Sequence, residues 1–400
     1  MVFLRVLTKE IKSFARTINR QRIIFTTWFE HFRREQRLHF MSLKHKVFSL
    51  IRINGLSRKT FLIGPTNSAN QGNEWSRALV RAGFKSQSLR ISSDPQGEFF
   101  VADLSIVRKD WIELPAREKL AEDIASNVDI ILFESLRPIL RLRGGKDVRN
   151  FILQDFDLMK KIGKKCGVIF HGSDIRDVDA HSARNSFSPF RTERLELQEL
   201  GKRSNENRAQ LDEIRRRKIP IFVSTQDLLI DLPDAQWLPV AIDFPKFSEI
   251  ADTSPLYTSQ KLRVLYLPSR SWLKSADLID PVLVKLAGEG LIDYINPGPV
   301  PHEQVPQLLS QCDLVIDQFL GVVGVFPIEA LTAGRLVMSY VPENSSTAPI
   351  INITPSTIEI ELRRVAKERP MPNGGIEYAQ RWHDGRASAD VIIRSFKIRS

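Results

Sequence analysis

The chain has 400 residues, enough for about two domains of ordinary size. Its composition, 42% hydrophobic and 26% charged with 20 Gly and 22 Pro, excludes collagen-like, disordered and multi-pass membrane proteins. The net charge is +11, and it is unevenly placed. Residues 1–59 hold 14 Lys and Arg against 3 Glu, whereas residues 60–400 hold equal numbers of basic and acidic side chains.

The N-terminal segment, residues 1–59, is predicted to form a basic amphipathic helical extension. Apolar side chains recur at helical spacing, as at Leu4, Leu7 and Ile11, with Lys and Arg between them. Such a helix can lie in the headgroup region of an anionic membrane, where each Lys or Arg contributes about 1 kcal/mol. The alternative is a helical hairpin packed on the body with its basic face in water. We expect contact with an anionic membrane surface through residues 1–57, and no nucleic acid, because no recognised binding module accompanies the charge.

Neither a signal peptide nor a membrane span is expected. Charged residues interrupt the N-terminus every few positions, so it lacks the apolar core of a secretory signal. No uncharged stretch approaches the roughly 18 apolar residues that a span requires. We therefore expect a cytoplasmic protein, peripheral on the inner face of the plasma membrane.

From Thr60 onward, short apolar runs alternate with amphipathic stretches, which is typical of βαβ units. A polar loop over residues 246–259 separates two series of such runs. The pattern predicts an α/β protein with two Rossmann-like domains and a cleft between them, the first over 60–245 and the second over 246–375. It also predicts a strand over Phe99–Leu104 and one long helix over residues 181–217.

Ligands of open parallel sheets bind outside the carboxyl ends of the strands, so we examined the residues that follow each predicted strand. After Phe61–Gly64, the polar turn that contains Asn70, Gln71 and Gly72 precedes a helix. Its backbone N–H groups and the helix N-terminus suit an anion or a sugar. The turn is not G-x-G-x-x-G, which disfavours a dinucleotide-dependent dehydrogenase. The alternative is an ordinary strand-to-helix turn.

His171 follows the apolar run Gly167–Phe170 and is followed by Asp174. A histidine titrates near neutral pH, so His171 can act as a base or bind a hydroxyl, and Asp174 can orient it or contact substrate. The alternative is a structural histidine. The nearby Asp177-Val178-Asp179 matches a metal-binding D-x-D by letter but stands several residues past the strand, so we expect no metal there.

Two further groups follow strands in the second series. Arg270 and Lys274 stand four residues apart, where two cations can hold a diphosphate. Glu329 lies in the first turn of a predicted helix, behind a loop in which Gly321 and Gly324 leave the backbone open. A carboxylate there can accept two vicinal hydroxyls, as on a ribose. The alternatives are solvated cations and an acidic residue that stabilises a helix N-terminus.

These segments occur in one order over residues 60–395: GPTNSANQG, HGSDIRD, WLPVAIDFPKF, PSRSWLKSADLI, PGPVPHEQVPQLLSQCDLVIDQ and GVFPIEALTAGRLV. Together they resemble glycosyltransferases of the GT-B fold, specifically the family 4-like group. The resemblance implies transfer of a sugar, with retention, from a nucleoside-diphosphate sugar to a glycan or a lipid-linked acceptor. It implies no metal or other cofactor, because positive side chains and helix dipoles neutralise the leaving diphosphate.

The resemblance also implies an acceptor role for the first domain, a donor role for the second, and a C-terminal helix over 376–400 that crosses back to the first domain. It also assigns roles to matching positions. In the second domain, Arg270 and Lys274 hold the donor diphosphate, Glu329 binds the donor ribose, the backbone of Gly324, Val325 and Phe326 faces diphosphate and sugar, and Pro297 to Val300 form the base pocket. In the first domain, His171 lines the reaction centre, and Asn70, Gln71, Gly72 and Asp174 belong to the acceptor and phosphate loops.

One position departs from the family pattern. The family has a second glutamate eight residues before the ribose-binding one, and here that position is Gly321. That carboxylate normally faces the donor sugar. Its absence leaves open a catalytically degenerate relative that binds a nucleotide or glycan without turnover.

Overall fold

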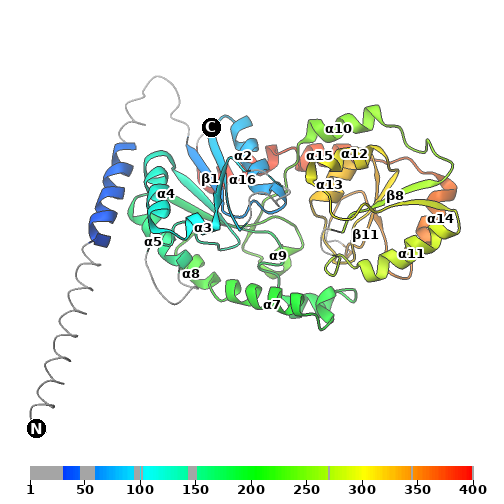
Figure 1. Cartoon of the computed structure of the whole chain (residues 1–400), viewed down its shortest axis with the longest axis horizontal. Helices are drawn as coiled ribbons and strands as arrows, with labels where there is room; N and C mark the ends of the chain where they lie inside the picture. Colours follow the sequence, from blue (N-terminus) through cyan, green and yellow to red (C-terminus); the bar gives the residue numbers. More distant parts are fainter. Residues whose placement is uncertain are drawn as a thin grey trace, which may run out of the picture.

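The structure is a computed structural model, and it describes residues 30–45, 59–93, 100, 102–142, 151–268, 271–343 and 346–398. It contains two α/β units side by side, each built on a parallel sheet (Figure 1). The first unit carries the N-terminal helix on its outer side, and the chain ends beside the first unit (Figure 1). Two Rossmann-like halves, as expected from the sequence, therefore form the body.

The first sheet has seven parallel strands in the order β3-β2-β1-β4-β5-β6-β7. Its central strands are buried on both faces, which explains their near-continuous apolar sequences, such as IILFE in β4. The strands are β1 (Thr60–Gly64), β2 (Lys85–Ser92), β3 (Leu104–Val107), β4 (Ile130–Glu134), β5 (Lys165–Phe170), β6 (Ile221–Val223) and β7 (Gln236–Trp237). The helices are α2 (Gln71–Arg81), α3 (Arg108–Trp111), α4 (Leu114–Asn127), α5 (Phe151–Lys161), α6 (Val178–Arg184), α7 (Leu195–Arg208), α8 (Leu211–Arg216) and α9 (Leu228–Asp231), with 3-10 turns η1 (Ser68–Asn70) and η3 (Pro189–Arg191).

The second sheet has five parallel strands in the order β12-β11-β10-β8-β9. The strands are β8 (Leu262–Tyr266), β9 (Ile292–Ile295), β10 (Leu314–Ile316), β11 (Leu336–Ser339) and β12 (Ile351–Asn352). The helices are α10 (Phe244–Thr253), α11 (Ala276–Gly288), α12 (Val305–Ser310), α13 (Val325–Thr332), α14 (Ile358–Glu368) and α15 (Gly375–Trp382), with the 3-10 turn η4 (His302–Gln304).

Strand order reverses direction once in each sheet, between β1 and β4 in the first and between β8 and β10 in the second. At such a switch point the loops that follow neighbouring strands diverge and leave a crevice for a ligand. The order of strands therefore selects the loops after β1, β4, β8 and β10 as the places where function is expected.

The C-terminal helix α16 (Arg386–Ser395) packs on the first sheet. Ile392 and Phe396 lie in the same buried cluster as Phe61, Ile63 and Trp75. The side chain of His383, just before α16, hydrogen-bonds the carbonyl of Val240 at 2.8 Å. Apolar burial by α16 thus ties the end of the chain to the first unit.

Residues 30–45 form a helix that packs against α4 and α5. Leu38 and Ser42 face inward, and Ser42 Oγ donates to the carbonyl of Ile162 at 2.6 Å. Phe40 and Leu43 point outward, with 60% and 51% of their surfaces exposed. The rest of the predicted extension, residues 1–29 and 46–58, lies outside the described residues. In the part of the chain that is described, no helix is long and apolar enough to cross a membrane.

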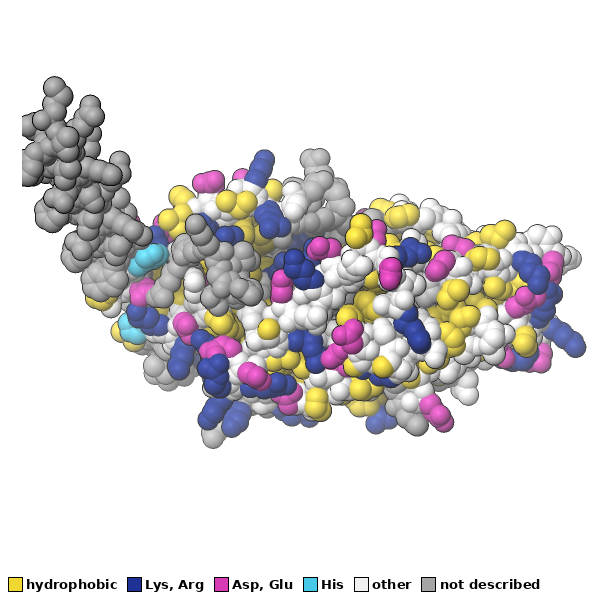
Figure 2. Space-filling model, turned by 90° about the horizontal axis from the view of Figure 1, so that it is seen from below, with side chains coloured by type: hydrophobic (Ala, Val, Ile, Leu, Met, Phe, Trp, Pro, Cys, Tyr) yellow, Lys and Arg dark blue, Asp and Glu magenta, His cyan; other side chains and the backbone are white. Residues whose placement is uncertain are grey.

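Acidic and basic side chains are interspersed over the face seen in Figure 2, as the balanced charge of residues 60–400 implies. Four local predictions were wrong. Residues 246–253 of the expected polar loop belong to helix α10 (Phe244–Thr253). Glu329, expected in the first turn of its helix, is the fifth residue of α13 (Val325–Thr332) and lies in the second turn. The third strand lies at Leu104–Val107 rather than Phe99–Leu104. Residues 181–217 form α6, η3, α7 and α8 rather than one helix, because Pro189 lacks an N–H donor and Ser188 accepts from the N–H of Phe190 as a new cap.

Candidate functional site

The loops at the two switch points are strained. Asn67, Ala69 and Asn70 after β1, Ser135 after β4 and Ser275 before α11 all have positive φ between 49° and 61°. A non-glycine residue in this region costs about 1–2 kcal/mol, and such strain persists where the surrounding structure enforces it, often at functional sites. The strained turns therefore mark the same crevices as the sheet topology.

Glu134, the last residue of β4, is the centre of the first crevice. Its side chain is fully buried, and Oε2 accepts hydrogen bonds from the backbone N–H groups of Thr66 (2.9 Å) and Asn67 (2.7 Å). Oε1 lies 2.9 Å from Nε2 of His171. Burial raises the pKa of Glu134, but the hydrogen bond and charge of His171, with the two backbone donors, outweigh it and hold the pKa below its usual range. The carboxylate is thus ionised, and both of its oxygens already accept hydrogen bonds from the protein.

His171 follows β5 and is held on two sides. The ring stacks on Trp75 of α2, with centroids 5.7 Å apart and planes 17° apart, and its Nε2 is engaged by Glu134. Burial lowers the pKa of His171, but the hydrogen bond and charge of Glu134, with the charge of Asp174, outweigh it and raise the pKa above its usual value. Because Nε2 is engaged by Glu134, Nδ1 is the nitrogen left to meet a ligand.

Asp174 shapes the loop that carries His171. Its carboxylate accepts from the backbone N–H groups of His171 and Gly172, at 2.8–3.1 Å, and from Ser135 Oγ at 2.5 Å. Asn207 of α7 donates to the carbonyl of Asp174 at 2.7 Å. The predicted contact residue Asp174 therefore joins the loops after β4 and β5, and its direct bonds orient the His171 backbone.

The turn Asn70–Gly72 lies at the predicted place, but its three residues do different things. The Asn70 amide donates to Glu74 Oε1 at 3.0 Å. Gln71 exchanges two hydrogen bonds with the backbone of Ala241, at 2.8 and 2.9 Å, so it secures the chain between the two units. A Cβ at Gly72 would come within 3.4 Å of Glu134 Oε2. Gly72 thus lets α2 approach the buried carboxylate, and Asn70 is the member of this turn nearest to open solvent.

In the second crevice, Lys274 is paired with Asp317. Nζ of Lys274 lies 2.5 Å from Oδ1 of Asp317, the residue that follows β10. The other oxygen, Oδ2, is buried and has no hydrogen-bond partner among the residues that the structure describes. Lys274 thus neutralises a buried carboxylate when no ligand is bound. Arg270, its predicted partner on the diphosphate, lies outside the described residues.

Glu329 of α13 is buried, and its Oε1 lies 2.6 Å from Nε2 of His302 in η4. Burial lowers the pKa of His302, but the hydrogen bond and charge of Glu329 outweigh it and raise that pKa. The His302 ring also lies 5.1 Å from the ring of Phe100, which belongs to the first unit. His302 follows the predicted base-pocket turn Pro297–Val300, so this turn and the predicted ribose carboxylate are neighbours.

Gly324 precedes α13 as its N-cap, with no side-chain cap, and Val325 and Phe326 begin the helix. A Cβ at Gly324 would meet nothing within 4 Å, so the backbone here is open to close approach. The first N–H groups of a helix carry partial positive charge. The predicted donor loop therefore presents a helix N-terminus beside Glu329.

Gly321, where the family has its second glutamate, lies at a contact between the units. Its φ is +86°, and a Cβ there would press on the Pro342 ring at 3.1 Å. The preceding carbonyl, that of Leu320, accepts from His181 Nε2 at 3.0 Å and Asn185 Nδ2 at 3.1 Å. Burial and Arg176 lower the pKa of His181 to about 4, so it is a neutral donor. A glutamate at this position would therefore be strained unless the Pro342 ring shifted.

A narrow slot separates the two units beside Gly321. It is lined by Thr225 and Asp227 after β6, by the 321–323 loop, and by Tyr378 and His383. Thr225 Oγ1, Asp227 Oδ1 and His383 Nε2 are buried without hydrogen-bond partners in the described ranges. His383 donates through Nδ1 to Val240, which leaves Nε2 as an acceptor. Three residues that line the slot therefore carry a buried polar atom without a hydrogen-bond partner among the described residues.

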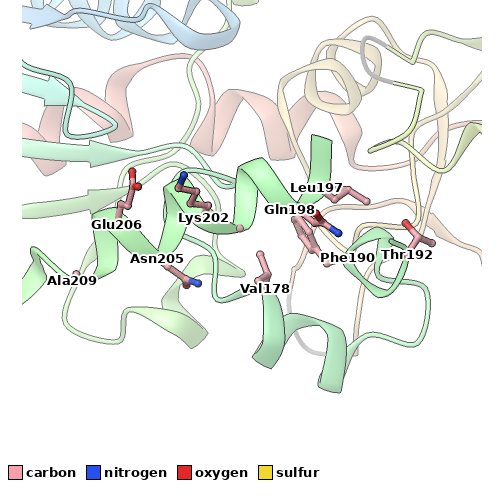
Figure 3. Close-up of a pocket in the computed structure, with 10 residues that line it drawn as sticks. Val178, Phe190, Thr192, Leu197, Gln198, Lys202, Asn205, Glu206 and Ala209 are labelled. Carbon is pink, nitrogen blue, oxygen red and sulfur yellow. The ribbon is translucent and has the colours of Figure 1, made fainter. Parts of the chain in front are cut away.

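A hollow of about 650 Å³ lies away from these crevices, between α6, η3 and α7. Figure 3 shows Val178 of α6 facing α7 across it. Phe190, Leu197 and Ala209 supply apolar walls, and Lys202 and Glu206 are among its polar residues. Helix α7 lines this groove and also bonds Asp174 through Asn207. The groove and the first crevice therefore share this helix.

Sequence reasoning missed Glu134, Trp75, His302 and Asp317. Glu134 ends an otherwise apolar strand and Asp317 follows another, so a charged residue at the end of a buried run was the available signal. No local pattern marks Trp75 or His302 as site residues. Among the described residues, no group of three or more His, Cys, Asp or Glu side chains could hold a metal ion.

No protein-family model and no curated protein matches the chain. Solved structures do resemble it. AviGT4, a glycosyltransferase involved in avilamycin A biosynthesis, is 14% identical with a TM-score of 0.46 over 85% of this chain and 97% of its own. An α-glucosyltransferase solved with UDP is 10% identical with a TM-score of 0.48 over 85% and 98% of the two chains. A glycosyltransferase from Rickettsia africae is 12% identical with a TM-score of 0.42 over 85% and 93%. Two parallel sheets side by side, with a C-terminal helix returned to the first, are the architecture that the resemblance to the GT-B fold implies.

Proposed function

We propose that the protein is a glycosyltransferase that moves a sugar, with retention, from a nucleoside-diphosphate sugar to a glycan or lipid-linked acceptor. The observation that carries the proposal is the pairing of two built crevices. One holds His171 on a buried carboxylate, and the other holds a lysine, an open helix N-terminus and a buried glutamate.

On the donor side, Lys274, Arg270 and the N-terminus of α13 supply positive charge to the leaving diphosphate without a metal. Lys274 leaves Asp317 to meet the phosphate oxygens. Glu329, fixed by His302, accepts the two hydroxyls of the ribose. The donor phosphate thus replaces Asp317 as the partner of Lys274, and the ribose becomes a second partner of Glu329.

On the acceptor side, His171 donates a hydrogen bond from Nδ1 to the sugar or its phosphate, and Asp174 and Ser135 fix the loop that carries it. The apolar groove between α6 and α7 has the size of a small-molecule site and suits the hydrocarbon part of a lipid-linked acceptor. Membrane contact through residues 1–57 brings the enzyme to such an acceptor at the cytoplasmic membrane face.

A second candidate is a degenerate GT-B protein that binds a nucleotide or glycan without turnover. It is favoured by Gly321 and by the contacts that fasten the 319–321 segment to His181 and Asn185. These contacts occupy the place where the family presents a carboxylate to the donor sugar.

The test is a screen of nucleoside-diphosphate sugars for thermal stabilisation, followed by assays of transfer and donor hydrolysis. A bound donor raises stability by RT ln(1 + [L]/Kd). We expect one base and sugar to stabilise the chain, and Glu329→Gln to weaken that donor by roughly 10- to 100-fold, as for the loss of a charge-assisted hydrogen bond. The exposed Glu368→Gln is the control. Stabilisation by no donor rejects the proposal, and binding with no turnover under any acceptor favours the second candidate.

A further inference from the structure

A basic hollow of about 340 Å³ lies beside the amino ends of β5 and β6, whereas the crevices lie at the carboxyl ends of the strands. Its lining comes from the end of α5, the turn before β5, the turn between α8 and β6, and the end of α16. Six cationic side chains and one acidic side chain line it: Lys160, Lys164, Lys165, Arg217, Lys218, Lys397 and Asp157. Phe156, Ile219, Pro220 and Phe396 give it an apolar floor.

Three of the six cations are already engaged. Lys164 and Lys165 donate to the carbonyls of Ala125 and Phe396, at 2.7 and 3.0 Å. Arg217 takes Asp157, the single acidic residue of the lining, at 3.1 Å. By contrast, the ammonium groups of Lys160, Lys218 and Lys397 make no hydrogen bond or ion pair within the described part of the chain. The hollow thus keeps three uncompensated charges.

The backbone at two of these lysines is unusual. Helices α5, α8 and α16 all end at the hollow in the same type of turn, in which the residue past the cap adopts positive φ. That residue is Gly163 after α5, but it is Lys218 (φ 55°) after α8 and Lys397 (φ 51°) after α16. Glycine is favoured at such positions, so both lysines occupy strained places.

A simpler explanation for the basic residues at these helix ends is that cations stabilise helix C-termini. It accounts for Lys164 and Lys165, whose ammonium groups bond carbonyls. Arg369, a third basic residue with positive φ at a helix end, also donates to the carbonyls of Ser259 and Gln260. Lys218 and Lys397 bond no carbonyl, and with Lys160 they converge from three helices on one hollow. Helix dipoles do not require that convergence.

The hollow also adjoins the helix formed by residues 30–45. Ser42 of that helix bonds the carbonyl of Ile162, between Lys160 and Lys164. Phe40 and Leu43 stand outward on the same helix. A ligand with a phosphate and an attached apolar group would meet the uncompensated ammonium groups and, within the lining itself, the apolar side chains of Phe156 and Phe396.

We propose that this hollow is a phosphate-binding site for the headgroup of an anionic phospholipid, distinct from the donor crevice. It does not depend on the proposed sugar transfer, because none of its residues lies in either crevice. Its lysines act as point charges on the phosphate oxygens, and the apolar floor contacts the glycerol part of the headgroup.

The test compares the full chain with a variant carrying Lys160→Gln, Lys218→Gly and Lys397→Gly. Binding is measured to phosphatidylcholine vesicles with and without phosphatidylglycerol, and to soluble glycerol phosphate and inorganic phosphate. Glycine suits the two positive-φ positions, so the variant should keep or raise its melting temperature. The matched control carries Lys261→Gln, Lys285→Gln and Lys367→Gln in the second unit, which removes the same charge far from the hollow.

We expect the triple variant to lose about 100-fold in affinity for the phosphatidylglycerol vesicles, since each lysine near an anionic surface contributes about fivefold, with little change in the control. Affinity for vesicles well above that for either soluble phosphate identifies the lipid as the source. Equal, lysine-dependent binding of glycerol phosphate keeps the phosphate site but overturns the lipid assignment. If the triple variant and the control bind alike, the hollow is not a phosphate site. Because the donor screen reads a different crevice, the two proposals fail independently.

Discussion

The two α/β units of this protein hold buried carboxylates in different ways at their switch points. In the first, Glu134 is fixed by two backbone N–H groups and by His171. In the second, Asp317 and Glu329 are each held by one side chain, Lys274 and His302. Backbone N–H donors can move only if the fold itself changes, whereas side chains can exchange hydrogen-bond partners by rotating. The first crevice is thus a fixed scaffold, and the second is built so that a charged ligand can replace resident ion pairs.

The largest expected effect comes from breaking the fixed crevice. Glu134→Ala leaves two backbone N–H groups without acceptors, and it removes the partner that raises the pKa of His171, so burial then favours the neutral ring. We expect a loss of about 2–5 kcal/mol in the free energy of unfolding, from two unpaired buried donors, and loss of transfer activity, measured by urea denaturation and by the donor assay. Glu199→Ala, on the exposed side of α7, should stay within roughly 0.5 kcal/mol of the parent. A similar stability for both variants would contradict a scaffold role for Glu134.

The second prediction tests the exchangeable pair. Lys274→Met leaves Asp317 buried and charged, so we expect it to lose both donor affinity and up to about 3–5 kcal/mol of stability. Adding Asp317→Asn removes the stranded charge and should recover most of the stability while donor binding stays lost. Calorimetric donor titration beside urea denaturation separates the two. If the double variant binds donor normally, Lys274 does not contact the diphosphate.

A third, smaller effect concerns the contact between the crevices. Gly321→Ala places a Cβ against Pro342 at a positive φ, which should cost roughly 1–3 kcal/mol. Gly324→Ala, whose Cβ meets open space, is the matched control for stability and should change it by less than about 1 kcal/mol. Equal melting temperatures for the two variants would show that the 319–321 segment is not tightly held.

The smallest effect is a pH dependence of stability. The pKa of His171 is raised in the folded chain, so its pairing stabilises the fold fully below the unfolded value near 6.5 and is lost as pH rises through the raised pKa. The pKa of Glu134 is lowered, so its contribution is present above the unfolded value and lost as pH falls through the folded one. The stability difference between the parent and His171→Gln should therefore shrink in alkaline solution. A difference that grows with pH would mean that His171 is neutral in the fold.

Much of the fold followed from local pattern. Apolar runs such as IILFE must be buried on both faces, so they read as central parallel strands, and Leu314–Ile316 was predicted to the residue. The chain positions that follow strands were also predictable, and His171 follows β5 as expected. The segment 181–217 was less predictable, because its high charge resembles one helix while Ser188 and Pro189 start a new turn.

The sequence by itself determined the composition, the uneven charge, the alternation of strands and helices, and the residue types that follow each strand. Only the tertiary structure decided which of those residues meet. Glu134 reaches Thr66 and His171 because β4 lies beside both β1 and β5, and Lys274 reaches Asp317 because β8 lies beside β10. Strand order is set by long-range packing, which no local pattern records. The same packing brings Lys160, Lys218 and Lys397 to one hollow. Positive charge is therefore concentrated at a second place, besides the N-terminal segment, although residues 60–400 carry no net charge.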